Sequence, residues 1–264
     1  MHRVILDGTD LEVSKLGFGT AALPNPILSS SDRQLVLRTA LDGGITHFDT
    51  ARLYGNGLAE KELGLFCKNI DRKQITVSTK VGFDINNFQK RFPMSHIVGR
   101  KIIENIIRKA IFPLTDFSPE GCDRSFSDSL RCLNTEWVDI LFIHEPAQAC
   151  NDQLEKLIPW LQLQKSLGKT RYLGLAGEQL DKIRVTNYFP NIFDVFQTSK
   201  TAMNYNNQLP IQPQIKYGYF SNLSVTQTKI AMEKIVAQKD SGMVLYSSHQ
   251  VERIKTFCAK FSSL

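Results

Sequence analysis

The chain of 264 residues lacks the features that mark secreted, metal-held and membrane-spanning proteins. Its five cysteines are an odd number at irregular spacings, and none belongs to a Cys-x-x-Cys pair, which argues against a disulfide framework and a zinc site. No uninterrupted apolar run is long enough to cross a bilayer, and the N-terminal MHRVILDGTD has no apolar signal-peptide core. We therefore expect a soluble, cytoplasmic protein with reduced thiols.

Charge of one sign is also not concentrated anywhere in the chain. The formal net charge is +6 and the pI is near 9.0, which suits an anionic cofactor or substrate. The basic runs RKQ, GRKIIEN and GKTR are short and interrupted, so we expect no nucleic-acid partner. Hydrophobic residues make up 42% of the chain, enough for a sizeable core, and we expect one domain over residues 1–264.

Strand-like runs alternate with helical segments along most of the sequence. The segment SSSDRQLVLRTALDGG has both ends of a helix, with Ser31 and Gln34 at capping-box spacing and Gly43 and Gly44 as the stop. Strand and helix alternating at this spacing indicate parallel strands joined by crossover helices. Eight strands can be counted, which predicts an α/β fold of the (β/α)8 barrel type. The expected strands are KLGFG, ITHFD, ITVSTK, VDILFI, RYLGLAG, FDVFQTSK, IKYGYFS and GMVLYSS.

Three segments depart from this alternation. RVILDGTDLEVS predicts an N-terminal β-hairpin that turns at Asp7 and Gly8. Residues 81–121 form a long excursion, and within it residues 95–111 could make a basic amphipathic helix that either packs on the barrel or covers the substrate. Residues 198–214 contain no clear sixth helix, so we expect the barrel to be shortened or irregular there. A kink or restart is expected at Pro159 in the helix before Gly168.

The string GFGTAA fits the G-x-G-x-x-A dinucleotide fingerprint, but its surroundings do not fit a Rossmann fold. Pro24 and Pro26 follow where the pyrophosphate-binding helix would have to begin, and no acidic residue ends a second strand about 20 residues later. We therefore assign this stretch to the barrel.

Four ionisable side chains fall at or just beyond the ends of three predicted strands: Asp49, Tyr54, Lys80 and His144. A tyrosine at its ordinary pKa of about 10 is a poor proton donor unless a cation stabilises the phenolate, and Lys80 would supply that cation. Each residue alone has a plainer interpretation, as a helix cap, a loop aromatic, a strand end and a core histidine. Their combination in this order indicates a catalytic site.

These residues, together with the string DTA-x-x-YG, make the chain resemble the aldo-keto reductase family, in particular its bacterial and plant aldose and galactose dehydrogenase type. The resemblance implies that the hairpin closes the bottom of the barrel and that the four residues lie at its mouth. It also implies hydride transfer between a nicotinamide and a carbonyl group of an aldehyde, ketone or sugar. Tyr54 would pass the proton, Lys80 would tune it, Asp49 would hold Lys80, and His144 would orient the carbonyl.

The resemblance extends to the cofactor site with less complete matches. Gln197 matches a glutamine that binds the nicotinamide carboxamide, and Tyr217 matches an aromatic residue that stacks on the ring, although it could instead be a barrel-wall aromatic. Relatives carry Ser-Asn where this chain has Ala176 and Gly177, so one carboxamide partner is missing unless Glu178 or a water substitutes.

Near the C-terminus, Ser247 and Ser248 stand where the family often has Lys-Ser. Arg253 stands where an arginine grips the adenosine 2′-phosphate, its alternative being a solvated helix residue. We therefore expect NADP, with NAD as the alternative cofactor, and no metal.

Two classes of function remain open from the sequence. The first is an NAD(P)(H)-dependent oxidoreductase acting on a small carbonyl or sugar, which the four residues favour. The second is a catalytically weak nicotinamide-binding barrel that serves as a redox sensor or partner-binding subunit, which the changed Ala176 and Gly177 positions favour. His47 is expected to pack outside the barrel, on the strand face opposite Asp49.

Overall fold

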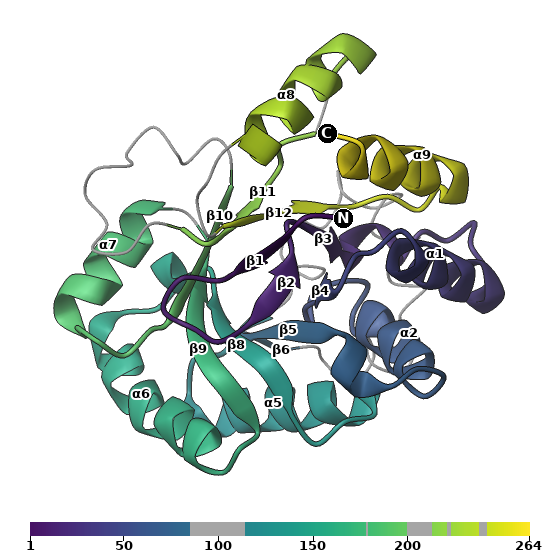
Figure 1. The fold of residues 1–264 in the computed structure, drawn as a ribbon. Coiled ribbons are helices and arrows are strands. Elements are labelled where there is room, and N and C mark those ends of the chain that lie inside the picture. Colours follow the sequence, from purple (N-terminus) through teal and green to yellow (C-terminus); the bar gives the residue numbers. More distant parts are fainter. Residues whose placement is uncertain (85–113, 178, 200–212, 221–222, 238–241) are drawn as a thin grey trace, which may run out of the picture.

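The computed structural model describes residues 1–84, 114–177, 179–199, 213–220, 223–237 and 242–264. Eight parallel strands close into a barrel, and helices surround them (Figure 1), which confirms the predicted (β/α)8 fold. The barrel strands are β3 (Leu16–Gly19), β4 (His47–Asp49), β5 (Thr76–Val81), β8 (Val138–His144), β9 (Thr170–Ala176), β10 (Val195–Ser199), β11 (Ile215–Tyr217) and β12 (Met243–Tyr246). The outer helices are α1 (Ser30–Asp42), α2 (Leu58–Cys67), α5 (Pro119–Leu133), α6 (Asn151–Ser166), α7 (Gln179–Tyr188), α8 (Val225–Ala237) and α9 (Val251–Ser262).

The barrel closes because β12 pairs with β3, after which the strands follow chain order round to β11. Successive strand residues point to opposite faces, so the core has two layers. On β8, Leu141 and Ile143 join the large cluster between strands and helices, whereas Ile140 and Phe142 belong to the cluster inside the barrel. Short parallel strands with this alternation place their C-terminal ends together at one mouth.

The N-terminal hairpin fills the opposite end of the barrel. β1 (Arg3–Ile5) pairs antiparallel with β2 (Glu12–Ser14), and Figure 1 shows the pair crossing the barrel end that faces the viewer. Leu6, Leu11 and Val13 are at most 1% exposed and pack inside the barrel. The turn is longer than a two-residue hairpin, because Leu6 N donates to Leu11 O at 3.0 Å around Gly8, whose φ is +75°. This plug leaves the other end as the place for a pocket.

One local prediction about the helices is wrong in detail. Helix α1 has its capping box at Ser29 and Asp32, two residues earlier than predicted, because Ser29 accepts from the Asp32 amide and Asp32 accepts from the Ser29 amide. Helix α6 continues through Pro159, so the helix does not restart there, and the kink stays a prediction. A proline costs an internal helix one hydrogen bond, and the buried apolar face of α6 outweighs that cost.

The proposed cover at residues 95–111 and the irregular sixth crossover at residues 200–212 lie outside the described residues. The described ends of the long excursion lie side by side, because β6 (Phe83–Asp84) pairs antiparallel with β7 (Leu114–Thr115). The chain therefore leaves β5 and returns to α5 at the same point of the barrel mouth.

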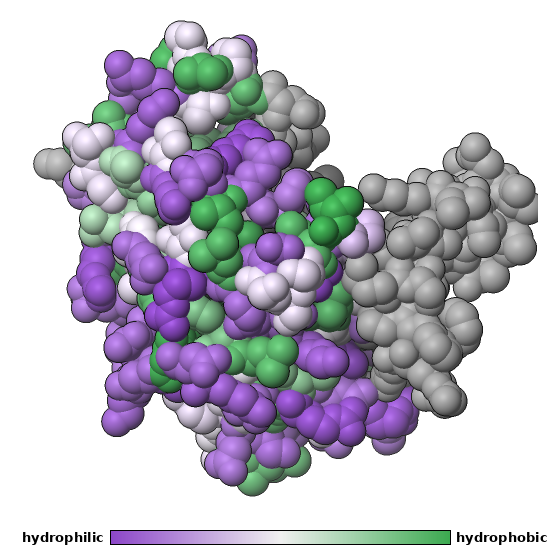
Figure 2. Space-filling model, turned by 90° about the vertical axis from the view of Figure 1, so that its right-hand side faces the viewer, coloured by the Kyte–Doolittle hydropathy of each residue, from purple (hydrophilic) through white to green (hydrophobic). Residues whose placement is uncertain are grey.

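Figure 2 shows the face over α1, α2 and α9, which hydrophilic residues mostly cover, with hydrophobic residues scattered among them. Leu35 on α1 and Leu65 on α2 are two exposed apolar side chains, at 53% and 37%. None of the helices that the structure describes combines the length and the apolar character needed to cross a membrane.

Candidate active site

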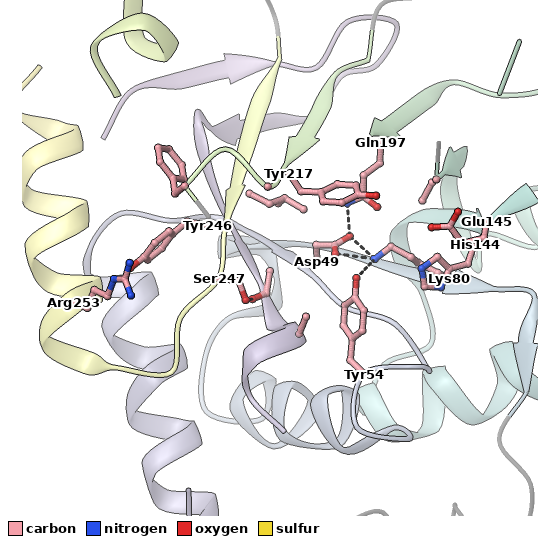
Figure 3. Close-up of a pocket in the computed structure, with 17 residues that line it drawn as sticks. Asp49, Tyr54, Lys80, His144, Glu145, Gln197, Tyr217, Tyr246, Ser247 and Arg253 are labelled. Atoms are coloured by element: carbon pink, nitrogen blue, oxygen red, sulfur yellow. Dashed lines mark hydrogen bonds and ion pairs between the residues drawn. The ribbon is translucent and has the colours of Figure 1, made fainter. Parts of the chain in front are cut away.

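The barrel brings the four ionisable residues of the sequence pattern together at its C-terminal mouth (Figure 3). Asp49 ends β4, Lys80 is the last but one residue of β5, and His144 ends β8. Tyr54 follows in the loop before α2, where its amide donates to Ala51 O at 3.0 Å. Adjacent strands in a parallel barrel present their ends side by side, which explains how residues far apart in sequence meet here.

Lys80 is held on three sides by oxygen atoms. Its ammonium donates to both carboxylate oxygens of Asp49, at 2.9 and 2.7 Å, and to the carbonyl oxygen of Thr50 at 2.9 Å. Its remaining contact is the phenol oxygen of Tyr54 at 3.2 Å. Lys80 and Asp49 are only 3% and 2% exposed. The ammonium is therefore fixed in place and aimed at the phenol, as the dashed contacts in Figure 3 show.

Asp49 is itself held by two neutral donors. The hydroxyl of Ser78 and the amide nitrogen of Gln197 each donate to Asp49 Oδ1 at 2.9 Å. A buried carboxylate that accepts several hydrogen bonds and faces one cation is held in one rotamer. Gln197, on β10, thus links the far side of the barrel to the Asp49 and Lys80 pair.

The electrostatics of the site depend on burial as much as on charge. Burial raises the pKa of the Tyr54 phenol above its ordinary value, and the Lys80 ammonium offsets only part of that rise. For Lys80, burial opposes the charged form, but Asp49 and then Tyr54 outweigh it and raise the pKa. The phenol therefore keeps its proton at neutral pH while a permanently charged ammonium touches its oxygen.

His144 also lies next to the phenol. Its ring centroid is 6.4 Å from that of Tyr54 and 5.1 Å from that of Phe83, in edge-to-face geometry with both. Burial, helped by the nearby Lys80 charge, lowers the pKa of His144 to about 3. The imidazole is therefore neutral at physiological pH and can donate one hydrogen bond, but it holds no extra proton to transfer.

These residues line a cavity of about 590 Å³ that extends away from Tyr54 towards α9. Tyr217, Ser247 and Arg253 line it together with Gln197, so four of the five residues predicted to bind cofactor share one pocket with the four ionisable residues. Ser248 does not line this pocket; it is 7% exposed, and its hydroxyl accepts from the Gln250 amide at 3.2 Å. The volume lies within the range of small-molecule and cofactor sites.

The far end of the cavity combines aromatic and basic groups. Tyr246 lines the cavity and stacks on Phe257, with ring centroids 3.9 Å apart and planes 9° apart. Ser247 donates its hydroxyl to Gly19 O at 2.7 Å, which ties the end of β12 to β3. Arg253 is an exposed residue of α9 at this end. The cavity thus has one end lined by Asp49, Tyr54, Lys80 and His144 and another end lined by the cation Arg253.

The expectation that His47 packs outside the barrel is wrong. His47 is 0% exposed, and its ring nitrogens lie 2.8 Å from Thr76 Oγ1 and 3.2 Å from Ser78 Oγ. Residues two apart on a strand share a face, so His47 must point inward with Asp49. Burial lowers the pKa of His47 to about 4.

One pocket residue, Glu145, was missed by the sequence analysis. It follows His144 with φ at +50° and lines the cavity. A Cβ on Gly177 would lie 2.9 Å from Glu145 Oε2, so the glycine makes room for this carboxylate. A non-glycine residue with positive φ cannot be recognised from a string such as FIHEP, because the conformation is imposed by the neighbouring strand end.

Within the described ranges, no group of three or more histidine, cysteine, aspartate or glutamate residues is arranged to hold a metal ion.

Asp49, Tyr54, Lys80 and His144 thus lie together beside a long cavity at the mouth of a (β/α)8 barrel. The model of the Aldo/keto reductase family matches residues 15–217, and the chain belongs to this family.

Individual relatives agree with this membership. The chain is similar to L-galactose dehydrogenase of Arabidopsis thaliana, with 33% identity over 67% of this chain and 48% of the relative. It is also similar to D-threo-aldose 1-dehydrogenase of a Pseudomonas species, with 29% identity over 66% of this chain and 53% of the relative. The chain thus spans about half the length of these curated relatives.

Among solved structures, an aldo-keto reductase from Klebsiella pneumoniae in complex with NADPH superposes with a TM-score of 0.69 at 15% identity. The match covers 99% of this chain and 90% of that one, and at this identity it establishes the shared fold.

Proposed function

We propose that the protein is an NAD(P)(H)-dependent oxidoreductase that transfers hydride between a nicotinamide and the carbonyl carbon of a small aldehyde, ketone or sugar, with Tyr54 as the proton donor. The observation that carries this proposal is the contact between Tyr54 Oη and Lys80 Nζ at 3.2 Å, with Lys80 clamped by Asp49. Family membership and the names of the two dehydrogenase relatives support the reaction class.

The proton step follows from the charges around the phenol. Tyr54 is protonated at neutral pH, and a fixed ammonium beside its oxygen stabilises the phenolate that forms when the proton leaves. His144 is neutral and donates a hydrogen bond that orients the carbonyl oxygen without competing as an acid. Asp49 prevents Lys80 from moving towards the phenolate as charge develops.

The cavity fits a dinucleotide cofactor, which when bound supplies or accepts the hydride. Tyr217 offers an aromatic face near Asp49 and Gln197 in Figure 3, and Arg253 offers a cation at the distant end. The Gln197 amide nitrogen donates one of its two N–H groups to Asp49, so its second N–H and its carbonyl oxygen can face a carboxamide. We propose NADP as the preferred cofactor, because Arg253 matches its 2′-phosphate. NAD is the alternative, because Ser247 offers no second cation for that phosphate.

The test is an absorbance assay of NADPH and NADH with a panel of aldehydes, ketones and sugars, run in both directions. Turnover of at least one substrate that disappears in Tyr54→Phe supports the proposal. A protein that binds NADPH in a fluorescence titration but turns over none of the panel would instead be the weakly catalytic sensor or partner-binding barrel. Absence of binding to either cofactor would contradict both.

A further inference from the structure

A second buried ion pair lies beneath the loop that carries Tyr54. Arg52 Nη1 donates to Glu60 Oε2 at 2.7 Å, and the two side chains are 5% and 0% exposed. Arg52 stands two residues before Tyr54, and Glu60 lies in the first turn of α2. The pair therefore joins the two ends of the segment that contains the phenol.

The backbone of this loop packs closely against the Arg52 side chain. Gly57 has φ at +87° and precedes α2, and a Cβ there would lie 2.4 Å from Arg52 Nη1. The guanidinium thus passes directly under the glycine, and any larger residue would displace it. The loop is fixed by a side chain inside it in addition to its own backbone hydrogen bonds.

The same carboxylate also holds the strand of the lysine. The hydroxyl of Thr79 donates to Glu60 Oε1 at 2.7 Å, and Thr79 is 0% exposed. Thr79 precedes Lys80 on β5, so its side chain points outward to α2 while that of Lys80 points inward. One oxygen of Glu60 therefore fixes the Tyr54 loop, and the other fixes the Lys80 strand.

The other polar contacts of Arg52 that the structure describes are longer. Asp128 and Cys132, both on α5, lie 3.9 Å and 3.5 Å from its guanidinium nitrogens. Burial opposes the charge of Arg52, but Glu60 outweighs it and raises the pKa of the guanidinium. The guanidinium therefore stays charged, and its shortest side-chain contact in the described structure is the one to Glu60.

We propose that Glu60, together with Arg52 and Thr79, is a positioning residue that sets the distance between the Tyr54 phenol and the Lys80 ammonium. The inference rests on the proposed function of that pair. A misplacement of about 1 Å at a reacting centre can cost roughly 100-fold in rate, so a carboxylate that fixes both partners of a 3.2 Å contact acts on turnover without touching substrate.

The experiment compares two changes at Thr79 with one matched control. Thr79→Val removes the hydroxyl that binds Glu60, and Thr79→Ser keeps it. Thr170→Val makes the same change at the closed end of the barrel, where Thr170 is 1% exposed and donates to Tyr172 O at 2.9 Å. For each variant, kcat, KM, the Kd for NADPH and the urea midpoint are measured, and a crystal structure gives the distance from Tyr54 Oη to Lys80 Nζ.

We expect kcat of Thr79→Val to fall roughly tenfold or more, with the Kd for NADPH within about twofold of wild type. Thr79→Ser should keep kcat within about twofold, and Thr170→Val should lower only the urea midpoint. If Thr79→Val does not fold, Glu60→Asp replaces it: this variant keeps the charge, withdraws the carboxylate by one methylene, and should show the same fall in kcat.

A folded Thr79→Val or Glu60→Asp protein with wild-type kcat would overturn the inference while leaving the proposed function standing. A wild-type protein that binds NADPH without turnover would overturn the proposed function instead. The crystal structures would then decide the inference alone: an unchanged distance between Tyr54 and Lys80 in the variant overturns it, and a longer distance supports it.

Discussion

The two ends of the barrel each bury a carboxylate against cations, yet we propose catalysis at only one of them. At the mouth, Asp49 holds Lys80 against the Tyr54 phenol. At the closed end, Asp139 is 1% exposed and accepts from Arg72 at 2.8 Å, from Arg171 at 3.0 Å and from the Val77 amide at 2.8 Å. Burial and ion pairing are thus shared by both ends and do not by themselves identify an active site.

The difference lies in the cation and in what it faces. A lysine ammonium is a compact point charge that can be aimed at one oxygen, and Lys80 is aimed at a group that can lose a proton. The arginines at the closed end are planar forks that tie strands together, and Arg171 also reaches Asp10 of the hairpin at 2.5 Å. The network at the closed end holds the N-terminal hairpin against the barrel, whereas the network at the mouth holds an ammonium against a phenol.

The largest effect that this comparison predicts comes from removing one hydroxyl at each end. Tyr54→Phe should lower kcat by about 100-fold to 10,000-fold, the usual contribution of a general acid, and leave the Kd for NADPH nearly unchanged. Tyr172→Phe is the matched change at the closed end, where the Tyr172 hydroxyl donates to Asp10 at 2.8 Å. Steady-state kinetics of Tyr54→Phe and Tyr172→Phe test this prediction. Comparable losses of kcat in the two variants would contradict the proposed difference between the two ends.

The next effect comes from removing the cation at each end. Lys80→Met should lower kcat about as much as Tyr54→Phe and should destabilise the fold by about 3–5 kcal/mol, because it strands the buried Asp49 charge. Arg72→Met should cost less stability, since Asp139 keeps Arg171, and should not change kcat. Urea unfolding and kinetics on the same preparations separate the two roles. An intact kcat in folded Lys80→Met would remove the lysine from the mechanism.

Much of this arrangement could be predicted from the sequence because strand ends carry its polar residues. Parallel strands that carry Asp49, Lys80 and His144 at or next to their C-terminal ends must place these residues at one mouth once the barrel closes. Periodicity also located nearly all elements, whereas the capping box of α1 was placed two residues late because several serines and acids compete for that position.

Tertiary features were harder to predict. His47 and Asp49 are two residues apart on β4, so strand alternation puts both side chains inside the barrel. The expectation that His47 packs outside was wrong because it assigned these two positions to opposite faces. Glu145 and Glu60 gave no local signal, because their surroundings come from distant parts of the chain. Gly177, just after β9, makes room for Glu145, and Thr79 on β5 binds Glu60. Contacts of this kind arise only when the chain is folded, so residue spacing does not reveal them.

The buried His47 is expected to make the free energy of unfolding depend on pH. Its pKa is lowered from the ordinary 6.5 to about 4, so the unfolded chain binds a proton that the folded protein refuses. The corresponding stability is fully present above pH 6.5 and is lost as the pH falls towards 4, by about 3 kcal/mol. Urea unfolding of wild type and His47→Gln at pH 7 and pH 4.5 measures this loss. Equal losses in both proteins would assign acid sensitivity to other groups.

The smallest predicted effect concerns the cationic end of the cavity. Arg253 is exposed and lines the pocket that reaches Tyr54, so a 2′-phosphate there would gain a charge-assisted contact that NADH cannot make. We expect NADPH to bind more tightly than NADH, and Arg253→Ala to weaken NADPH roughly tenfold with little effect on NADH. Lys255→Ala is the control, because Lys255 lies on the same helix but pairs with Glu252 at 2.8 Å. Fluorescence titration with both cofactors measures the ratio of affinities. Equal binding of the two cofactors by wild type would make Arg253 a solvated helix residue, and the cavity would then not distinguish NADPH from NADH.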